Sequence, residues 1–293
     1  MRTCRVESKY GHFKPFDVGG DNLVVIAGPC SLESFELGIE VGEVMRDICA
    51  ELGFKYIFKA SFDKANRTSI KSWRGPGMEI GLEQLSRIGK ELQVPTLTDI
   101  HEAWQANVAA EAVDMLQIPA FLCRQTDLLV AAAKTLKPIN IKKAQFLAPE
   151  DMLSALNKCR DSGGNACLCE RGTTMGYHQL VVDMRSLVEM RAFDCPVIFD
   201  ATHSVQKPGA GGTASGGDRR FILPLSRAAA AIGLDGIFIE THPNPPEAKC
   251  DGPNMIPLAR VKDFLYQIKI IDSIVRNEIG FTEIDFMEKY KER

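Results

Sequence analysis

The sequence predicts one closed (β/α)₈ barrel, the TIM barrel fold, preceded by a short N-terminal hairpin. Eight short β-rich runs recur along the chain, and each ends in polar or glycine residues. Segments with helical spacing lie between most of these runs, and this alternation over about 270 residues favours a parallel barrel. An open, doubly wound sheet is the alternative, but no strand–GxGxxG–helix turn occurs near the first run.

The predicted strands are short runs rich in aliphatic residues, as expected for strands that are buried on both faces. In chain order they are Leu23–Ala27, Lys55–Ala60, Thr96–Asp99, Met115–Ile118, Ile139–Lys142, Cys167–Cys169, Val197–Asp200 and Gly236–Glu240.

The predicted helices carry apolar residues three or four positions apart, which is typical of a helix with one buried face. They cover Phe35–Leu52, Met78–Leu92, Ala103–Val113, Asp127–Lys134, Pro149–Lys158, Leu180–Met190, Leu225–Ile232 and Val261–Ile279.

The first residues of the chain precede the barrel. We expect 1–22 to be an N-terminal extension and 23–293 to be the catalytic barrel domain. Gly11 separates Arg5–Tyr10 from His12–Phe16, which predicts a hairpin that plugs the bottom of the barrel.

Charge and cysteine usage exclude several classes of protein. Lys and Arg number 35 against 38 Asp and Glu, a net charge of −3, so nothing favours nucleic-acid or membrane binding. No apolar run is long enough to span a bilayer, and the N-terminus lacks a signal-like apolar segment. The nine cysteines are an odd number in such a chain, which indicates reduced thiols and a cytoplasmic location.

Basic residues follow several predicted strands, where the active sites of such barrels form. Alternation places Lys59 and Ser61 on one strand face, and a lysine that points into a barrel is costly unless it is paired. The set therefore predicts a cavity for a multiply anionic ligand, whereas a solvated charged loop is the alternative interpretation. Asp99 is a candidate orienting group. The cations are Lys59, Lys64, Arg67, Arg124, Lys142 and Arg171.

A thiol, an imidazole and two carboxylates follow the first, seventh and eighth strands, which are neighbours in a closed barrel. This mixed donor set suits Fe²⁺, Zn²⁺ or Mn²⁺. No CxxC or HExxH pair is present, so a buried, inert Cys30 explains the spacing equally well. His242 and Cys250 are alternative ligands. The four candidates are Cys30, His203, Glu240 and Asp251.

A glycine-rich segment follows the seventh strand. Residues Lys207–Gly217 contain five glycines in eleven positions. At the mouth of a barrel this composition predicts a lid that closes over a ligand, and a plain long loop is the alternative.

Several long motifs resemble the 3-deoxy-D-manno-octulosonate 8-phosphate synthases, and the resemblance runs from about residue 23 to residue 272. It implies a cytosolic (β/α)₈ enzyme, usually a homotetramer, that makes a lipopolysaccharide sugar. Members condense phosphoenolpyruvate with D-arabinose 5-phosphate and water, and they release inorganic phosphate. The motifs are Phe58–Ser69, Arg74–Gly77, Gln117–Asp127, Phe199–Gln206 and His242-Pro243 through Cys250–Pro253.

The resemblance also implies roles for individual residues. Arg124 would reach the arabinose 5-phosphate from a neighbouring subunit, and Cys30 is typical of the metal-dependent members, with His203, Glu240 and Asp251 as co-ligands. The residues expected to hold phosphoenolpyruvate are Lys59, Ser61, Lys64, Gln117, Lys142 and Arg171. Those expected to hold arabinose 5-phosphate are Asn66, Arg67 and Thr68. The catalytic set is expected to be Lys59, Lys64, Asp99, Lys142 and His203.

Three alternatives to this function stay open. Related 3-deoxyheptulosonate 7-phosphate synthases use erythrose 4-phosphate and typically read Lys-Pro-Arg-Thr-Ser where this chain reads Lys-Ala-Asn-Arg-Thr-Ser, so Asn66 favours the five-carbon sugar. A Schiff-base aldolase would use Lys59 or Lys142. A non-catalytic barrel would only bind sugar phosphates. Thr68 keeps the hydroxyl of the serine that is frequent there, and Glu170 replaces an aspartate of some members without an evident role.

Overall fold

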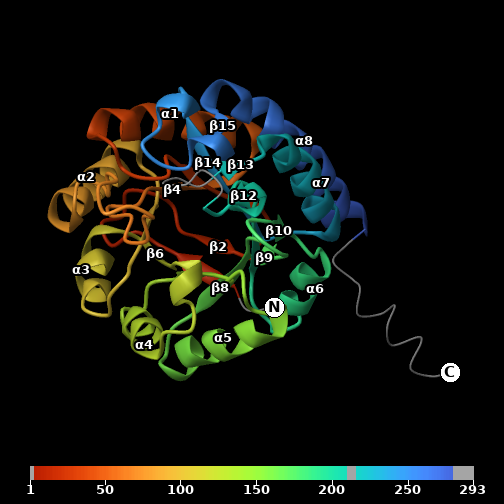
Figure 1. Ribbon diagram of the computed structural model, residues 1–293, viewed down its shortest axis with the longest axis horizontal. Helices are drawn as coiled ribbons and strands as arrows, with labels where there is room; N and C mark the ends of the chain where they lie inside the picture. The colour runs from red at the N-terminus through yellow and green to blue at the C-terminus, as the bar shows by residue number, and fades with distance from the viewer. Residues whose placement is uncertain (1–2, 210–215, 280–293) are drawn as a thin grey trace.

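The computed structural model describes residues 3–209 and 216–279. Parallel strands form a closed barrel inside a ring of helices (Figure 1). The barrel closes where the seventh and eighth strands pair in parallel, with Asp200 opposite Phe238. The predicted barrel is confirmed. Its strands are β3 (Val24–Gly28), β4 (Lys55–Lys59), β5 (Thr96–Asp99), β6 (Met115–Ile118), β7 (Ile139–Lys142), β8 (Ala166–Glu170), β11 (Val197–Asp200) and β14 (Gly236–His242).

Helices pack on the outside of the barrel through their apolar faces. The first one shows why it begins and ends where it does. The Ser34 side chain accepts a hydrogen bond from the backbone N of Leu37, and Gly53 takes the left-handed conformation that ends the helix. The helices are α1 (Phe35–Leu52), α2 (Met78–Leu92), α3 (Gln105–Ala112), α4 (Thr126–Lys134), α5 (Met152–Asp161), α6 (Arg185–Arg191), α7 (Ile222–Ile232) and α8 (Val261–Ile274), which continues as a π-helical turn over Val275–Ile279.

The predicted helix over Leu180–Met190 is wrong in its first part. Leu180–Val181 is strand β10, which pairs antiparallel with β9 (Thr173–Thr174). The helix α6 begins later because the Asp183 carboxylate accepts a hydrogen bond from the backbone N of Arg185. The run of three apolar residues after Gln179 therefore belongs to an extended segment and not to a helix face.

The N-terminal hairpin is confirmed, but its two strands have three residues each, and the second lies later than predicted, because it begins at Phe16, where the predicted segment His12–Phe16 ends. Strand β1 (Cys4–Val6) pairs antiparallel with β2 (Phe16–Val18). Their apolar side chains are buried with those that fill the lower barrel, among them Ile26 and Phe238. The connection between the two strands turns at Ser8, whose hydroxyl accepts backbone hydrogen bonds from residues 10 and 12.

The barrel interior changes from apolar to charged along its axis. Its lower part is filled by residues such as Ile57, Leu97 and Ile198. Towards the carboxyl ends of the strands the buried side chains include Lys59 and Lys142. Buried charges need partners, so this end must contain compensating carboxylates. No helix in the described ranges has the length and apolar character to cross a membrane.

Candidate active site and metal centre

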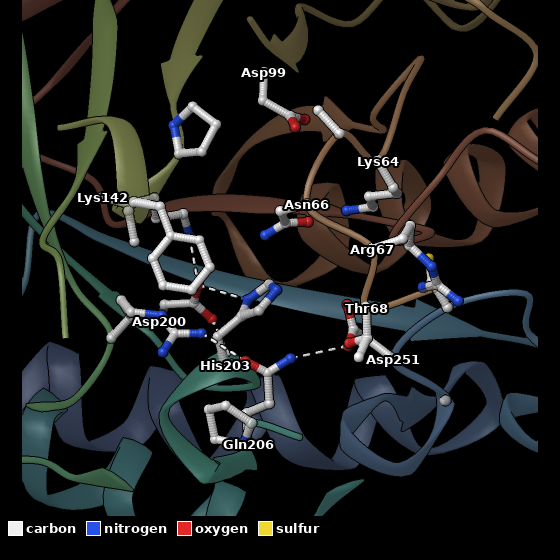
Figure 2. Close-up of a pocket in the computed structure, with 18 of the residues that line it drawn as sticks. Lys64, Asn66, Arg67, Thr68, Asp99, Lys142, Asp200, His203, Gln206 and Asp251 are labelled. Carbon is white, nitrogen blue, oxygen red and sulfur yellow. Dashed lines mark hydrogen bonds and ion pairs between the residues drawn. The ribbon is translucent and has the colours of Figure 1, made fainter. Parts of the chain in front are cut away.

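A cavity of about 740 Å³ opens at the carboxyl ends of the barrel strands (Figure 2). Most of the predicted site residues line it, although they come from segments far apart in the sequence. The predicted residues that line the cavity are Lys59, Lys64, Asn66, Arg67, Thr68, Asp99, Gln117, Lys142, Arg171, His203 and Asp251.

Lys142 and His203 share one carboxylate, that of Asp200. The Lys142 ammonium donates to Asp200 Oδ2, and His203 Nδ1 lies 2.7 Å from the same oxygen. Burial raises the pKa of Asp200, but the charges of His203 and Lys142 lower it more, so the net pKa lies below its usual range. The sequence pattern gave Asp200 no role, although it ends a predicted strand and lies three positions before His203.

Lys59 is held between β3 and β14. Its ammonium donates to the backbone O of Cys30 at 2.9 Å and to Glu240 Oε1 at 3.2 Å. The other carboxylate oxygen of Glu240 is buried without a hydrogen-bond partner among the described residues, and it lies 3.6 Å from His203 Nε2. Burial raises the pKa of Glu240, and the charges of His203 and Lys59 lower it further than burial raises it.

Gln206 links a cation to a carboxylate across the cavity. Arg171 Nη2 donates to Gln206 Oε1 at 2.8 Å, and Gln206 Nε2 donates to Asp251 Oδ1 at 2.9 Å. The second guanidinium nitrogen, Nη1, is buried without a partner in the part of the chain that the structure describes. Sequence reasoning missed Gln206, although it ends one of the motifs that carry the family resemblance.

Ser61 and His101 hold Asp99 from opposite sides. The Ser61 hydroxyl donates to Asp99 Oδ1, and His101 Nε2 lies 3.1 Å from Asp99 Oδ2. Burial raises the pKa of Asp99, but the hydrogen bond from His101 and the charge of Lys59 lower it well below its usual range. Ser61 is fully buried and does not line the cavity, so its hydroxyl serves the carboxylate in this structure.

The loop after β4 carries the predicted sugar-phosphate residues to the rim of the cavity. It is held by a bidentate pair between Arg74 and Asp63. A Cβ at Gly75 would lie 2.4 Å from the Phe62 carbonyl oxygen, so only glycine fits there. Burial lowers the pKa of Lys64, but nearby groups, chiefly Cys30 and Glu240, raise it well above its usual range.

The predicted metal ligands converge in two overlapping groups. Ligand atoms of Cys30, Cys250 and Asp251 lie within 4.8 Å of one another, and so do those of His203, Glu240 and Asp251. Asp251 belongs to both groups and its backbone takes the left-handed conformation, with φ of 50°. Burial raises the pKa of the Cys30 thiol well above its usual value. A thiol, an imidazole and two or more carboxylate oxygens are a donor set for a divalent transition metal.

Three sequence-based candidates lie elsewhere. Arg124 is exposed and does not line the cavity of this chain, and Lys158 donates to its carbonyl oxygen. His242 contacts Asn244 and lies 4.0 Å from Glu33, outside both ligand groups. The centre of the predicted lid, 210–215, lies outside the described residues. Its flanks form the short ribbon of β12 (Gln206–Lys207) and β13 (Gly216–Gly217).

The fold and the site define a (β/α)₈ barrel enzyme whose cavity places cations beside candidate metal ligands. A family model described as the DAHP synthetase I family matches residues 10–277, and this chain belongs to that family.

Named relatives agree with this assignment. A protein of Desulfotalea psychrophila named 2-dehydro-3-deoxyphosphooctonate aldolase is 59% identical over 250 residues, which is 85% of this chain and 89% of the relative. Proteins with the same name from Bordetella pertussis and Acidithiobacillus ferrooxidans (strain ATCC 53993) are 52% identical over 280 residues and 50% identical over 293 residues. These two alignments cover 93% and 100% of this chain, and 98% and 99% of the relatives. The resemblance seen in the motifs is therefore confirmed.

Proposed function

We propose that this chain condenses phosphoenolpyruvate with D-arabinose 5-phosphate and water. The products are 3-deoxy-D-manno-octulosonate 8-phosphate and inorganic phosphate, and the reaction serves the synthesis of the lipopolysaccharide sugar. Relatives at 50–59% identity carry the name of the enzyme that handles this eight-carbon product. One observation carries the proposal: a single cavity contains both a deep set of cations and a second cation–hydroxyl set at its rim.

The deep cations suit phosphoenolpyruvate, which carries a carboxylate and a phosphate. Lys142 and Arg171 are each about 95% buried, and Gln117 lines the same region. A guanidinium binds a planar or tetrahedral anion through two nitrogens, and the Nη1 atom of Arg171 has no protein partner among the described residues. We assign Lys59, Lys64, Lys142, Arg171 and Gln117 to this substrate, and Ser61 acts on it through Asp99.

The rim set suits the sugar phosphate. Asn66, Arg67 and Thr68 line the cavity mouth from one loop, and together they offer an amide, a guanidinium and a hydroxyl. Arg67 Nη2 lies 3.3 Å from the backbone O of Lys249, so its side chain reaches across the mouth towards the loop after β14. This arrangement favours a phosphate at the rim with the aldehyde end of the sugar directed inwards.

The chemistry joins C3 of the enol phosphate to the aldehyde carbon, while water adds at C2 and the phosphate later leaves by C–O cleavage. Fixed cations hold both substrates in attack geometry and stabilise the charge that develops on the phosphate. His203 lies between the carboxylates of Asp200 and Glu240, a position in which an imidazole can hold or transfer a proton.

A divalent metal fits the ligand set of Cys30, His203, Glu240 and Asp251. Among the described residues the buried Oε2 atom of Glu240 has no hydrogen-bond partner, and this supports the fit, because a buried carboxylate oxygen is costly unless a proton donor or a cation satisfies it. Fe²⁺, Zn²⁺ and Mn²⁺ are the candidates. The chemistry that such an ion supplies is polarisation of a carbonyl or water oxygen.

The remaining expectations concern assembly and compartment. The exposed position of Arg124 is compatible with its guanidinium completing the rim of a neighbouring subunit in a homotetramer. We place the enzyme in the cytoplasm, a compartment that suits nine free cysteine thiols.

Two ion pairs argue against a Schiff-base aldolase. Lys59 and Lys142 each donate to a buried carboxylate, whereas imine formation needs an amine nitrogen with a free lone pair. Borohydride treatment in the presence of substrate is therefore expected to leave no covalent adduct.

Phosphate release on mixing the substrates tests the function. We expect release with phosphoenolpyruvate and arabinose 5-phosphate together, none with either alone, and much slower release with erythrose 4-phosphate. Faster release with erythrose 4-phosphate would favour the synthase of the seven-carbon product. No release with any aldose phosphate would favour a non-catalytic barrel that only binds sugar phosphates.

A further inference from the structure

A third buried ion pair lies beside the cavity, next to residues that line it. Lys143 Nζ is 3.6 Å from Glu170 Oε1, and both side chains are only 1% exposed. Neither residue lines the cavity, yet each is the chain neighbour of one that does, Lys142 and Arg171. In the described part of the chain, Glu170 is the carboxylate that lies within ion-pair distance of the Lys143 ammonium.

Both carboxylate oxygens of Glu170 are occupied. Oε1 accepts a hydrogen bond from the backbone N of Gly172 at 2.6 Å, and Oε2 accepts one from the Ser186 hydroxyl of α6 at 2.5 Å. The carboxylate therefore ties the turn after β8 to the helix outside the barrel. Gly172 has φ of 92°, a conformation in which other residues are strained.

Lys143 fixes the same turn from the other side. Its ammonium donates to Thr173 Oγ1 at 2.9 Å, and its backbone N donates to the carbonyl oxygen of Cys169 at 2.8 Å. The pair thus holds residue 170 directly and residues 172 and 173 by hydrogen bonds. The residue in the middle of this short turn is Arg171, whose guanidinium points into the cavity and contacts Gln206.

Stability alone does not account for such a pair. Burying two charges costs about as much as their attraction returns, so well-packed apolar residues often serve a fold equally well. Two of the contacts made here, to the Gly172 backbone and the Thr173 side chain, fall on the residues that directly follow one cavity cation, Arg171. Lys143 Nζ also lies 3.4 Å from the carbonyl oxygens of Ala144 and Leu147. A guanidinium that binds an anion by two directed hydrogen bonds needs a backbone that holds its Cα atom in place, because a small shift of the Cα becomes a larger shift at the end of the long side chain.

We propose that Lys143 and Glu170 are positioning residues that fix the Arg171 guanidinium for binding of an anionic substrate. The pair touches no substrate itself, and it acts through the turn over 170–173. The identity of the anion as phosphoenolpyruvate rests on the proposed function.

The test replaces the pair by Lys143→Met together with Glu170→Met, in the wild-type chain and in an Arg171→Ala chain. In the wild-type background we expect KM for phosphoenolpyruvate to rise about tenfold, as for one misdirected charge-assisted hydrogen bond. KM for arabinose 5-phosphate is expected to stay within twofold. In the Arg171→Ala background the pair replacement should change KM for phosphoenolpyruvate by less than twofold, because its target is already absent. An equal rise in both backgrounds, or an unchanged KM in the wild-type background, would overturn the proposal.

Asp235→Asn is the matched control for lost stability. Asp235 is a buried carboxylate 3.6 Å from Arg191 Nη2, and it accepts a hydrogen bond from the backbone N of Val197 at the opposite end of the barrel. The Asp235→Asn substitution should lower the unfolding temperature and leave KM for phosphoenolpyruvate unchanged. If the double methionine variant does not fold, Glu170→Asp keeps the charge but shortens the reach to Gly172. It is then expected to raise KM for phosphoenolpyruvate threefold or more at an unfolding temperature near wild type, and an unchanged KM would refute the proposal.

Calorimetric binding of phosphoenolpyruvate and of inorganic phosphate separates this proposal from the proposed function. If the wild-type chain releases no phosphate from the two substrates, the function is wrong. The pair is then judged by whether its replacement weakens anion binding only when Arg171 is present.

Discussion

Replacing Gln206 by leucine tests most sharply whether the hydrogen-bonded link between Arg171 and Asp251 supports catalysis. The Gln206 amide joins Arg171 to Asp251 by hydrogen bonds of 2.8 and 2.9 Å. Figure 2 shows it below His203, with a dashed line from its amide to Asp251. Leucine has a similar size but neither a donor nor an acceptor, so the substitution removes both contacts without opening a large void.

The expected loss follows from these two contacts. A hydrogen bond to a charged group contributes about 1.5–3 kcal/mol, and the lower value applies beside a water-filled cavity. Two such bonds give about 3 kcal/mol, which corresponds to a fall of about a hundredfold in kcat/KM. The fall should include a higher KM for phosphoenolpyruvate, because Arg171 loses its one side-chain partner among the described residues.

Phosphate release measures this loss, with metal content per chain determined in parallel. Gln84→Leu is the matched control, since Gln84 lies on α2 and does not line the cavity. It should leave kcat/KM at the wild-type value. A Gln206→Leu variant within threefold of wild type would show that the bridge between cation and carboxylate does not support catalysis.

Further predictions concern metal, packing and pH. Chelation should abolish phosphate release, Fe²⁺, Zn²⁺ or Mn²⁺ should restore it, and Cys30→Ala should lower the metal bound per chain. Gly217→Ala would place a Cβ 1.3 Å from Asn254 Oδ1, so it should cost about 1–3 kcal/mol in urea unfolding, and adding Asn254→Ala should recover most of this. Burial raises the pKa of Cys195 from 9.0 to about 12. The folded state therefore holds this proton more tightly than the unfolded state. Its contribution to the free energy of unfolding is complete below pH 9 and is lost between pH 9 and 12 at about 1.4 kcal/mol per pH unit. The free energy of unfolding of Cys195→Ala should therefore fall less steeply with pH in this range.

Much of the barrel could be predicted because its signals are local. Each predicted strand ends in polar residues, and parallel strands in a closed barrel bring their carboxyl ends together. This rule alone places Lys142, Arg171 and His203 around one cavity, as found. The short ribbon of β9 and β10 escaped prediction because two-residue strands have no period, and Leu180 and Val181 suit a helix face equally well.

The pairing inside the cavity could not be predicted. Lys142 on β7 meets Asp200 on β11 although β8 lies between these strands, so the contact crosses the barrel interior. Such contacts depend on barrel radius and side-chain rotamers, which sequence spacing does not report. The role of Gln206 could not be predicted either, because a neutral side chain between two charged partners leaves no distinctive pattern in the sequence.

These pairs explain how a cavity can be both strongly cationic and stable before substrate binds. A buried ammonium needs a counter-charge at all times. Lys59 has Glu240 and Lys142 has Asp200, whereas Arg171 is joined to Asp251 only through Gln206. Of these three buried cations, Arg171 is therefore the one without a direct carboxylate partner among the described residues, and burial lowers its pKa despite the nearby carboxylates. Of the three, it is the residue where an arriving anion displaces no carboxylate from a direct pair. The turn that carries Arg171 is therefore the part of the wall where rigidity has the greatest effect on binding.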